Sequence, residues 1–352
     1  MALLDYVLEP PSYGWADKAG NLIKPTAGQL FKEYLSRVNI FKTRKNWLAF
    51  TSWFWAISLI PFLLVFIFKY FSFWLLALGF VYSMVLMGSH GTVWYHRFGT
   101  HNAFKFRNNF WRIITKNLVL KVIPDEIYIV SHHVHHFIPD KPGDPYNTFV
   151  SWLYCFLADA NHQMVARNLS EKDYRIATGF LKHTGTAINS YEEYQLWGSI
   201  SKPLPVWFNW AANWIFWGVV FYLIGGFPLM CTLFGAAHVW AIGVRTFNYE
   251  GHGKGKDKRE VGMDFNWEDL SINQYWPGYV AGEWHNNHHL YPHSAQNGFK
   301  PDQVDIPWYY IKFLHMIGGI KSYNNNKKDF YEDHYLPYLK QKAETKKQEA
   351  VS

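Results

Sequence analysis

Three long stretches of the chain contain no Asp, Glu, Lys or Arg, and they set the expected fold class. Residues 46–68 and 70–96 are separated only by Lys69, and residues 203–244 are broken by the turn signal GGFP at 225–228. A membrane-spanning helix needs about 20 apolar residues. The pattern therefore predicts an all-α integral membrane protein with four transmembrane helices in two hairpins. The predicted spans lie near residues 47–68, 71–92, 206–226 and 229–247. Core helices of a soluble protein are the alternative, but four such runs are hard to bury.

The spans divide the chain into three predicted parts. Residues 1–45 form an N-terminal arm, residues 46–310 a membrane domain, and residues 311–352 a C-terminal segment with a basic tail. The end of this tail is Lys-rich and polar, so we expect it to be disordered. Two amphipathic helices, over residues 26–41 and 104–120, are expected to lie in the headgroup layer or on the polar cap.

The distribution of basic residues predicts the orientation in the membrane. Of the 34 Lys and Arg residues, only Lys69 lies between residues 46 and 96, and none lies between 203 and 244. By the positive-inside rule, both termini and both large polar segments face the cytoplasm. The net charge of +7 is accordingly assigned to a membrane surface and not to nucleic acid. The N-terminus has no signal peptide pattern. We find no C-terminal retention tetrapeptide and no fused cytochrome, which favours a bacterial inner membrane over the endoplasmic reticulum.

The amino-acid composition indicates histidine as the residue type that would bind a metal. The chain has two cysteines, which excludes a thiolate metal cluster and a disulfide framework, and it has 17 histidines. Most of these histidines fall into three short segments, HRFGTH, SHHVHH and HNNHH, and another follows the fourth span in NYEGHG. The numbered residues are His96, His101, His132, His133, His135, His136, His285, His288, His289 and His252.

The spacing H-x-x-H-H occurs twice and predicts two metal ions. Prolines bound both segments, so each segment is expected to be a short helix, over 125–138 and 278–290. In a helix, His132 and His136 share one face, whereas His135 is rotated by about 100°. The second helix repeats this geometry. Each helix can thus give two ligands to one metal and a third ligand to a neighbouring metal.

Neutral imidazole binds iron, copper, zinc and nickel, and a pair of irons is our interpretation. Zinc hydrolysis is the rival chemistry, but the H-E-x-x-H arrangement with its general-base Glu is missing. The alternative without a metal is that these are surface or pH-sensing histidines. Four histidines in five residues, followed by a second H-x-x-H-H, argue against it.

The three motifs in this order, with two hairpins, resemble the membrane fatty acid desaturases, and within them the stearoyl-CoA and bacterial delta-9 acyl-lipid group. The stretches that carry the resemblance are HRFGTHNAF, SHHVHHFIPDKPGDPYN and GEWHNNHHLYPHSA, within residues 45–310. The resemblance implies a cytosolic helical cap that carries a histidine-rich di-metal site. It further implies that Asn248 reaches one iron through a water molecule. It assigns one iron to His96, His101, His132, His136 and His288, and the other to His135, His252, His285 and His289.

The resemblance implies an O2-dependent acyl desaturase that introduces a cis double bond, of delta-9 type, into a long-chain acyl-CoA or acyl-lipid. Two Fe ions (Fe2+/Fe3+) would be the cofactor and O2 the co-substrate, with no catalytic side chain beyond the metal ligands. The basic face is expected to bind an acidic electron donor, of cytochrome b5 or ferredoxin type. Three alternatives stay open: a fatty acid hydroxylase, an oxidative decarboxylase that forms a terminal alkene, and a membrane metal-binding protein without turnover.

Overall fold

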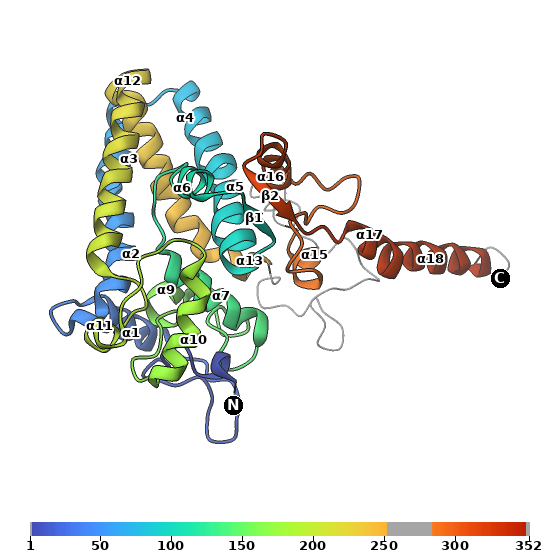
Figure 1. Ribbon diagram of the computed structural model, residues 1–352, viewed down its shortest axis with the longest axis horizontal. Helices are drawn as coiled ribbons and strands as arrows, with labels where there is room; N and C mark the ends of the chain where they lie inside the picture. The colour runs from blue at the N-terminus through green and yellow to red at the C-terminus, as the bar shows by residue number, and fades with distance from the viewer. Residues whose placement is uncertain (1, 252–283, 350–352) are drawn as a thin grey trace.

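The computed structural model describes residues 2–251 and 284–349, and these are mostly helical (Figure 1). The helices of the first half are α1 (Ala27–Val38), α2 (Trp47–Ser58), α3 (Ile60–Val65), α4 (Phe73–Phe80), α5 (Gly88–Gly91), α6 (Asn109–Lys116), α7 (Asp125–Phe137), α8 (Trp152–Phe156) and α9 (Ala158–Asn161). The later helices are α10 (Glu171–Lys182), α11 (Tyr191–Trp197), α12 (Pro203–Gly243), α13 (Phe247–Gly251), α15 (His285–Leu290), α16 (Ile306–Met316), α17 (Lys327–Phe330) and α18 (Leu336–Glu349).

Among the described residues, three continuous helical stretches are long and apolar enough to cross a membrane. They are Arg44–Tyr70, Phe73–Thr100 and Pro203–Thr246. The first joins η2 (Arg44–Asn46), α2, α3 and the π-helical turn η3 (Phe66–Tyr70). The second joins α4 and α5 with the π-helical segments η4 (Val81–Met87) and η5 (Thr92–Thr100). These two stretches correspond to the first predicted hairpin.

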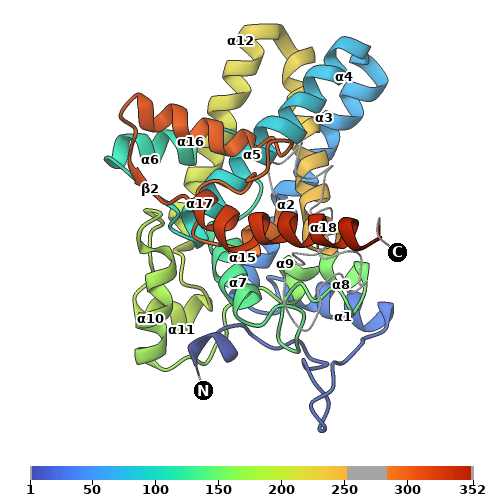
Figure 2. The same cartoon turned by 90° about the vertical axis from the view of Figure 1, so that its right-hand side faces the viewer.

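The third stretch, at 44 residues, is about twice the length that one crossing needs, and it folds back on itself. Gly225 and Gly226 leave helical geometry, and Gly226 has a φ of 67°, which favours glycine. The rings of Trp214 and Phe234 lie 5.6 Å apart, although 20 residues of straight helix would separate them by about 30 Å. Figure 2 shows the two arms of α12 side by side. The chain thus turns at the predicted GGFP break.

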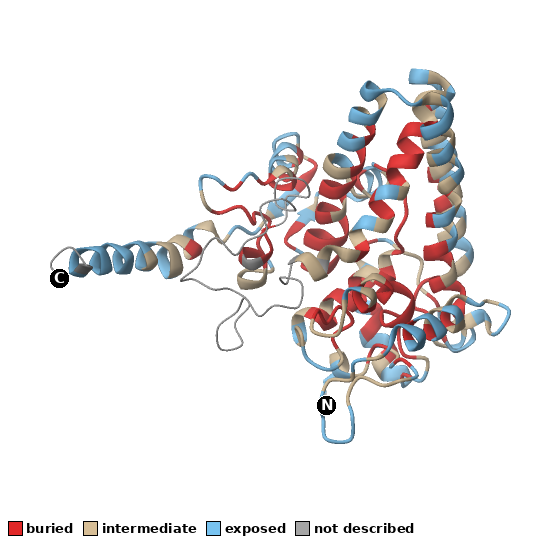
Figure 3. Ribbon diagram, turned by 180° about the vertical axis from the view of Figure 1, so that it is seen from behind, coloured by how far each residue is buried: buried red, intermediate tan, exposed pale blue. Residues whose placement is uncertain are grey.

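The helices with apolar sequence expose large apolar side chains on their outer faces, which are drawn as exposed in Figure 3. A soluble monomer rarely exposes contiguous apolar patches of this kind. The most exposed examples are Phe68 (83%), Phe73 (82%), Trp74 (72%), Phe208 (78%) and Leu223 (76%). This surface is that of a membrane protein.

Shorter helices pack together at one end of the apolar stretches, and we call this group of helices the cap. Its buried core includes Val130, Val165, Leu181 and Tyr194, from α7, α10, α11 and the connecting loops. A second core joins α1 and α9 to α2 through Leu30, Trp47 and Trp53, among others. The cap is thus continuous with the start of the first apolar stretch, and Ile127 of α7 belongs to the same core.

The expected helix over residues 104–120 is wrong in its first turn. Phe104–Phe106 forms strand β1, which pairs antiparallel with β2 (Ile320–Tyr323), and the helix α6 begins only at Asn109. The strand pair ties the end of the second apolar stretch to the C-terminal part of the chain. The expected disorder of the tail is wrong as well up to residue 349, because α18 is a helix. Its Ala, Glu, Lys and Gln residues favour helix strongly enough to explain this.

Candidate metal centre

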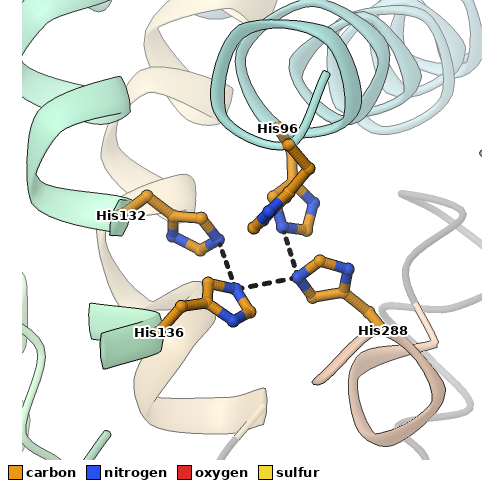
Figure 4. Close-up of side chains that lie close together, drawn as sticks. His96, His132, His136 and His288 are labelled. Atoms are coloured by element: carbon orange, nitrogen blue, oxygen red, sulfur yellow. Dashed lines mark hydrogen bonds between the residues drawn. The ribbon is translucent and has the colours of Figure 1, made fainter. Parts of the chain in front are cut away.

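Three separate elements bring five histidines to one point. His96 lies in η5 and His101 directly follows it, His132 and His136 lie in α7, and His288 lies in α15. One ring nitrogen of each lies within 4.8 Å of those of the other four. In Figure 4 the labelled rings of His96, His132, His136 and His288 point toward one another. This group is called the first imidazole set below.

The spacing of the ring nitrogens fits a shared metal ion. The Nε2 atoms of His96 and His288 are 2.8 Å apart, those of His288 and His136 are 2.9 Å apart, and those of His136 and His132 are 3.2 Å apart. Imidazole nitrogens that bind one first-row metal at about 2.1 Å lie roughly 3 to 3.4 Å apart. The buried Nε2 of His101 has no hydrogen-bond partner among the described residues. A cation among these rings would satisfy it.

Burial keeps this set in the form that binds metal. Burial lowers the pKa of His101, His132 and His288 well below the usual value, and the neighbouring histidines lower each pKa further. These imidazoles are therefore neutral at physiological pH. Metal ligation requires neutral imidazole, so no proton has to be removed from these three rings before an ion binds.

A second group lies next to the first. The ring nitrogens of His135, His285 and His289 lie within 4.8 Å of one another. His285 and His289 are one helical turn apart in α15, and their Nε2 atoms are 3.1 Å apart. The rings of His136 and His289 stack with centroids 4.3 Å apart, so the two sets are adjacent. We call this group the second imidazole set.

The helical geometry expected from H-x-x-H-H is present in both helices, as far as they are described. The helix over 125–138 is α7, and α15 covers 285–290 of the expected 278–290, whose first residues lie outside the described residues. His252 also lies outside the described residues. Asn248 belongs to α13, but its side chain is not among those described. The start of α13 reaches the second set, because the rings of Phe247 and His285 are 5.8 Å apart.

Asp144 holds His135 in place and was not identified from the sequence. Its two carboxylate oxygens lie 3.0 and 3.1 Å from Nδ1 of His135, and both residues are fully buried. The same carboxylate accepts the backbone N–H groups of Asp140 and Tyr146. A carboxylate on one ring nitrogen directs the other toward a metal and raises its basicity. The stretch GDPYN carries this residue.

A buried ion pair fixes the distance between the first histidine motif and the C-terminal part. Arg97, next to His96, donates to Asp305 at 2.9 Å and to the backbone oxygen of Ala295 at 2.6 Å. Asp305 also accepts the backbone N–H groups of Asn297, Gly298 and Trp308. Removal of one partner would leave an uncompensated buried charge, so the pair is expected to hold these two segments together. It positions the chain segment that follows α15.

Two further polar residues hold the ligand helices. Asn287, in the middle of H-N-N-H-H, donates to the backbone oxygen of Asn297 at 2.7 Å and to Gln303 at 2.8 Å, so it anchors α15 from behind. The Nδ1 atom of His293 lies 2.7 Å from the backbone oxygen of His101. His133 belongs to neither set: its ring lies against that of Phe180, with centroids 4.6 Å apart, and 6.5 Å from the ring of His101. The described cysteines, Cys155 and Cys231, belong to neither imidazole set.

Comparison with known proteins identifies the family. The family model described as fatty acid desaturase matches residues 71–339. The palmitoyl-monogalactosyldiacylglycerol delta-7 desaturase of Arabidopsis thaliana is 27% identical over 54% of this chain and 46% of its own length. The acyl-CoA C20 delta-5 desaturase of Anemone leveillei is 25% identical over 64% of this chain and 66% of its own length. The sn-1 stearoyl-lipid 9-desaturase of Anabaena variabilis is 24% identical over 64% of this chain and 75% of its own length.

The chain spans about half the length of the first of these relatives and just under two thirds of the second. The family match itself covers most of the chain, from the second apolar stretch to α18, and includes all three histidine motifs. This chain belongs to the fatty acid desaturase family.

Proposed function

We propose that this protein is an O2-dependent desaturase that introduces a cis double bond, of delta-9 type, into a long-chain acyl-lipid or acyl-CoA. The observation that carries the proposal is the pair of adjacent imidazole sets beneath apolar hairpins. A carbon–hydrogen bond of a methylene group is far too weak an acid for any side-chain base. Two irons bound at these sets would supply the oxidising power, with O2 as co-substrate.

The residues of the chain hold and orient the metals in this proposal. His96, His101, His132, His136 and His288 would bind one iron. His135, His285 and His289 would bind the other, with His252 as a fourth ligand and Asn248 through a water molecule. Iron fits the donor set, because neutral imidazole suits it. The contact of Phe247 with His285 supports the role of Asn248 and His252, which follow it in the chain.

We infer that the site lies at the cytoplasmic surface of the membrane. We infer four crossings, made by the first two apolar stretches and the two arms of α12, with both termini and the cap in the cytoplasm. The distribution of Lys and Arg supports this orientation. The basic cytoplasmic face would attract an acidic electron donor such as cytochrome b5 or a ferredoxin. A bacterial inner membrane is our proposed location.

Lipid analysis of cells that express the chain tests the proposal. Gas chromatography should detect a new cis double bond in the wild type and none in the His132→Ala variant. His133→Ala is the matched control, since it removes an imidazole from the neighbouring position of the same helix, and it should retain the product. Detection of a hydroxy acid would indicate a hydroxylase instead. Detection of a terminal alkene one carbon shorter would indicate an oxidative decarboxylase. Bound metal with unchanged lipids would overturn the enzymatic proposal altogether.

A further inference from the structure

A cavity of about 330 Å³ lies away from the imidazole sets, between α6, the start of α7 and the first turns of α12. None of the histidines of either set lines it. Its polar lining includes Arg112, Lys116, Lys121 and Asp125, and its apolar lining includes Ile113 and Trp210. Three cationic side chains therefore face one carboxylate, and the cavity carries a surplus of positive charge.

Among the lining residues, only one of the three cations forms an ion pair with the single carboxylate. Lys116 lies 2.7 Å from Asp125 and neutralises it. Arg112 donates to the backbone oxygen of His183 at 3.0 Å, and no carboxylate contacts it among the described residues. Lys121 is only 6% exposed, and its ammonium group contacts the amide oxygen of Asn209. Burial and the nearby charge of Lys116 lower the pKa of Lys121 to about 7, although Asp125 raises it. A phosphate group bound in the cavity would favour the charged form of Lys121.

The backbone makes room for the guanidinium group. Gly185 has a φ of 71°, and a Cβ atom at this position would lie 2.7 Å from the terminal nitrogen of Arg112. The loop of residues 184–187 therefore packs directly against the flat face of Arg112 and fixes its direction. A guanidinium group held in this way, with free N–H groups, is suited to an oxyanion such as phosphate.

The two helices that contribute most to the cavity, α6 and α12, carry exposed apolar side chains near it in the chain. Ile113, which lines the cavity, is 56% exposed, and Phe110 on the same helix is 62% exposed. On α12, Leu204 and Phe208 are 83% and 78% exposed, in the same turns as the lining residues Pro205 and Asn209. An amphipathic helix with exposed aromatic and aliphatic residues belongs at a membrane boundary. Exposed apolar side chains of α6 and α12 are thus close in the chain to residues that line the cavity.

We propose that this cavity binds the phosphate group of an anionic membrane phospholipid. The Arg112 and Lys121 side chains bind the phosphate oxygens, and the acyl chains leave along Ile113, Leu204 and Phe208. The site is separate from the metal centre and does not depend on the proposed reaction. A free phosphate ion shares the headgroup chemistry but leaves these exposed apolar side chains unused.

The test is a thermal unfolding measurement on the full-length protein in a non-ionic detergent, with added phosphatidylglycerol, phosphatidylcholine or inorganic phosphate. We expect phosphatidylglycerol to raise the unfolding temperature and the other two to have little effect at the same concentration. Charge-assisted hydrogen bonds are strong enough that Arg112→Gln should weaken the apparent affinity about tenfold. Arg175→Gln, which changes an exposed arginine of α10, should leave it unchanged.

Three results would overturn the proposal. An equal response to phosphatidylcholine would mean that apolar contact alone stabilises the protein. An equal response to inorganic phosphate would assign the cavity to a free anion. An unchanged affinity in Arg112→Gln would locate lipid binding elsewhere. Should that variant not fold, Lys121→Met keeps the length of the side chain without its charge, and the same three comparisons apply to it.

Discussion

The carboxylate of Asp144 determines how His135 presents its second nitrogen, so its removal is expected to weaken the second imidazole set. Asp144→Asn keeps the size of the side chain but removes its charge and one acceptor oxygen from the contact with Nδ1 of His135. Loss of such a contact typically costs 10- to 100-fold in metal affinity or activity. Iron per protein, measured by elemental analysis after dialysis, should fall from two toward one.

Asp302→Asn provides the matched control, because this carboxylate is half-exposed and lies 3.8 Å from Lys300. Its iron content should equal that of the wild type, since an exposed ion pair contributes little. Equal iron in Asp144→Asn and the wild type would mean that His135 needs no carboxylate partner.

Glu126 makes the stability of the cap depend on pH. Its carboxylate accepts the N–H groups of Ile200 at 2.9 Å and Ser201 at 2.7 Å, and burial raises its pKa to about 7. The pKa in the unfolded chain is about 4.3, so folding favours the protonated form. The protonated carboxyl group contributes its full stability below pH 4, and this contribution is lost as the pH rises through 7.

Comparison of the wild type with Glu126→Gln isolates this contribution, because the amide does not titrate. The variant should be less stable than the wild type at pH 5, because the amide fits the hydrogen bonds of the carboxyl group less well. The difference in unfolding temperature between the wild type and the variant should shrink between pH 5 and pH 8. A difference that stays constant over this range would show that the carboxyl group does not change its protonation there.

At the scale of elements, glycines set how closely the helices of the two hairpins approach. A Cβ atom at Gly235, in the second arm of α12, would lie 2.8 Å from the Cα atom of Leu63 in α3. Small residues allow such close contact between membrane helices. Gly235→Ala should therefore force the helices apart and lower stability by about 1–3 kcal/mol.

Gly243→Ala is the control on the same helix, because nothing lies within 4 Å of a Cβ atom there. Alanine favours helix over glycine by up to about 1 kcal/mol, so this variant should be as stable as the wild type or more so. The unfolding temperature in detergent measures both. Equal effects of the two substitutions would contradict a packing role for Gly235.

The elements that the sequence predicts are those whose signal is local. The hairpins follow from uncharged runs, and α7 follows from its bounding prolines and the four-residue spacing of His132 and His136. Strand β1 was missed because the alternation in Phe104–Phe106 is too short to stand out, and its partner lies more than 200 residues away. The grouping of the histidines, which the family resemblance implied, agrees with the two groups that the structure brings together for the eight described members, and their role as metal ligands stays a prediction.

Residues that hold the ligands were missed for a related reason. Asp144 lies in a loop without periodicity, so nothing in its neighbourhood points to His135. Asp305 pairs with Arg97 across about two hundred residues, and His293 contacts a backbone oxygen, which every residue possesses. Such contacts depend on the completed fold.

At the scale of the whole molecule, the imidazole sets connect α15 to helices that lie far from it in the sequence. His288 and His289 come from α15, whereas their neighbours come from η5 and α7, so bound metal would cross-link the C-terminal part to the rest. The Arg97–Asp305 pair and the β1–β2 pair make the same connection without metal. A ligand that binds only the folded form stabilises that form, so removal of the metal by a chelator should lower the stability of the protein. We expect α15 to become less tightly held while the rest of the chain stays folded.

Hydrogen–deuterium exchange before and after chelation tests this expectation. Exchange should become faster in residues 285–290 and in 132–137, and it should stay unchanged in α10, whose buried face packs on the cap core through Tyr174 and Leu181. The unfolding temperature should fall, and added iron should restore both measurements. Faster exchange throughout the cap would contradict this expectation. It would mean that the metal stabilises the whole fold, and that the ion pair and the strands alone do not keep the C-terminal part in place.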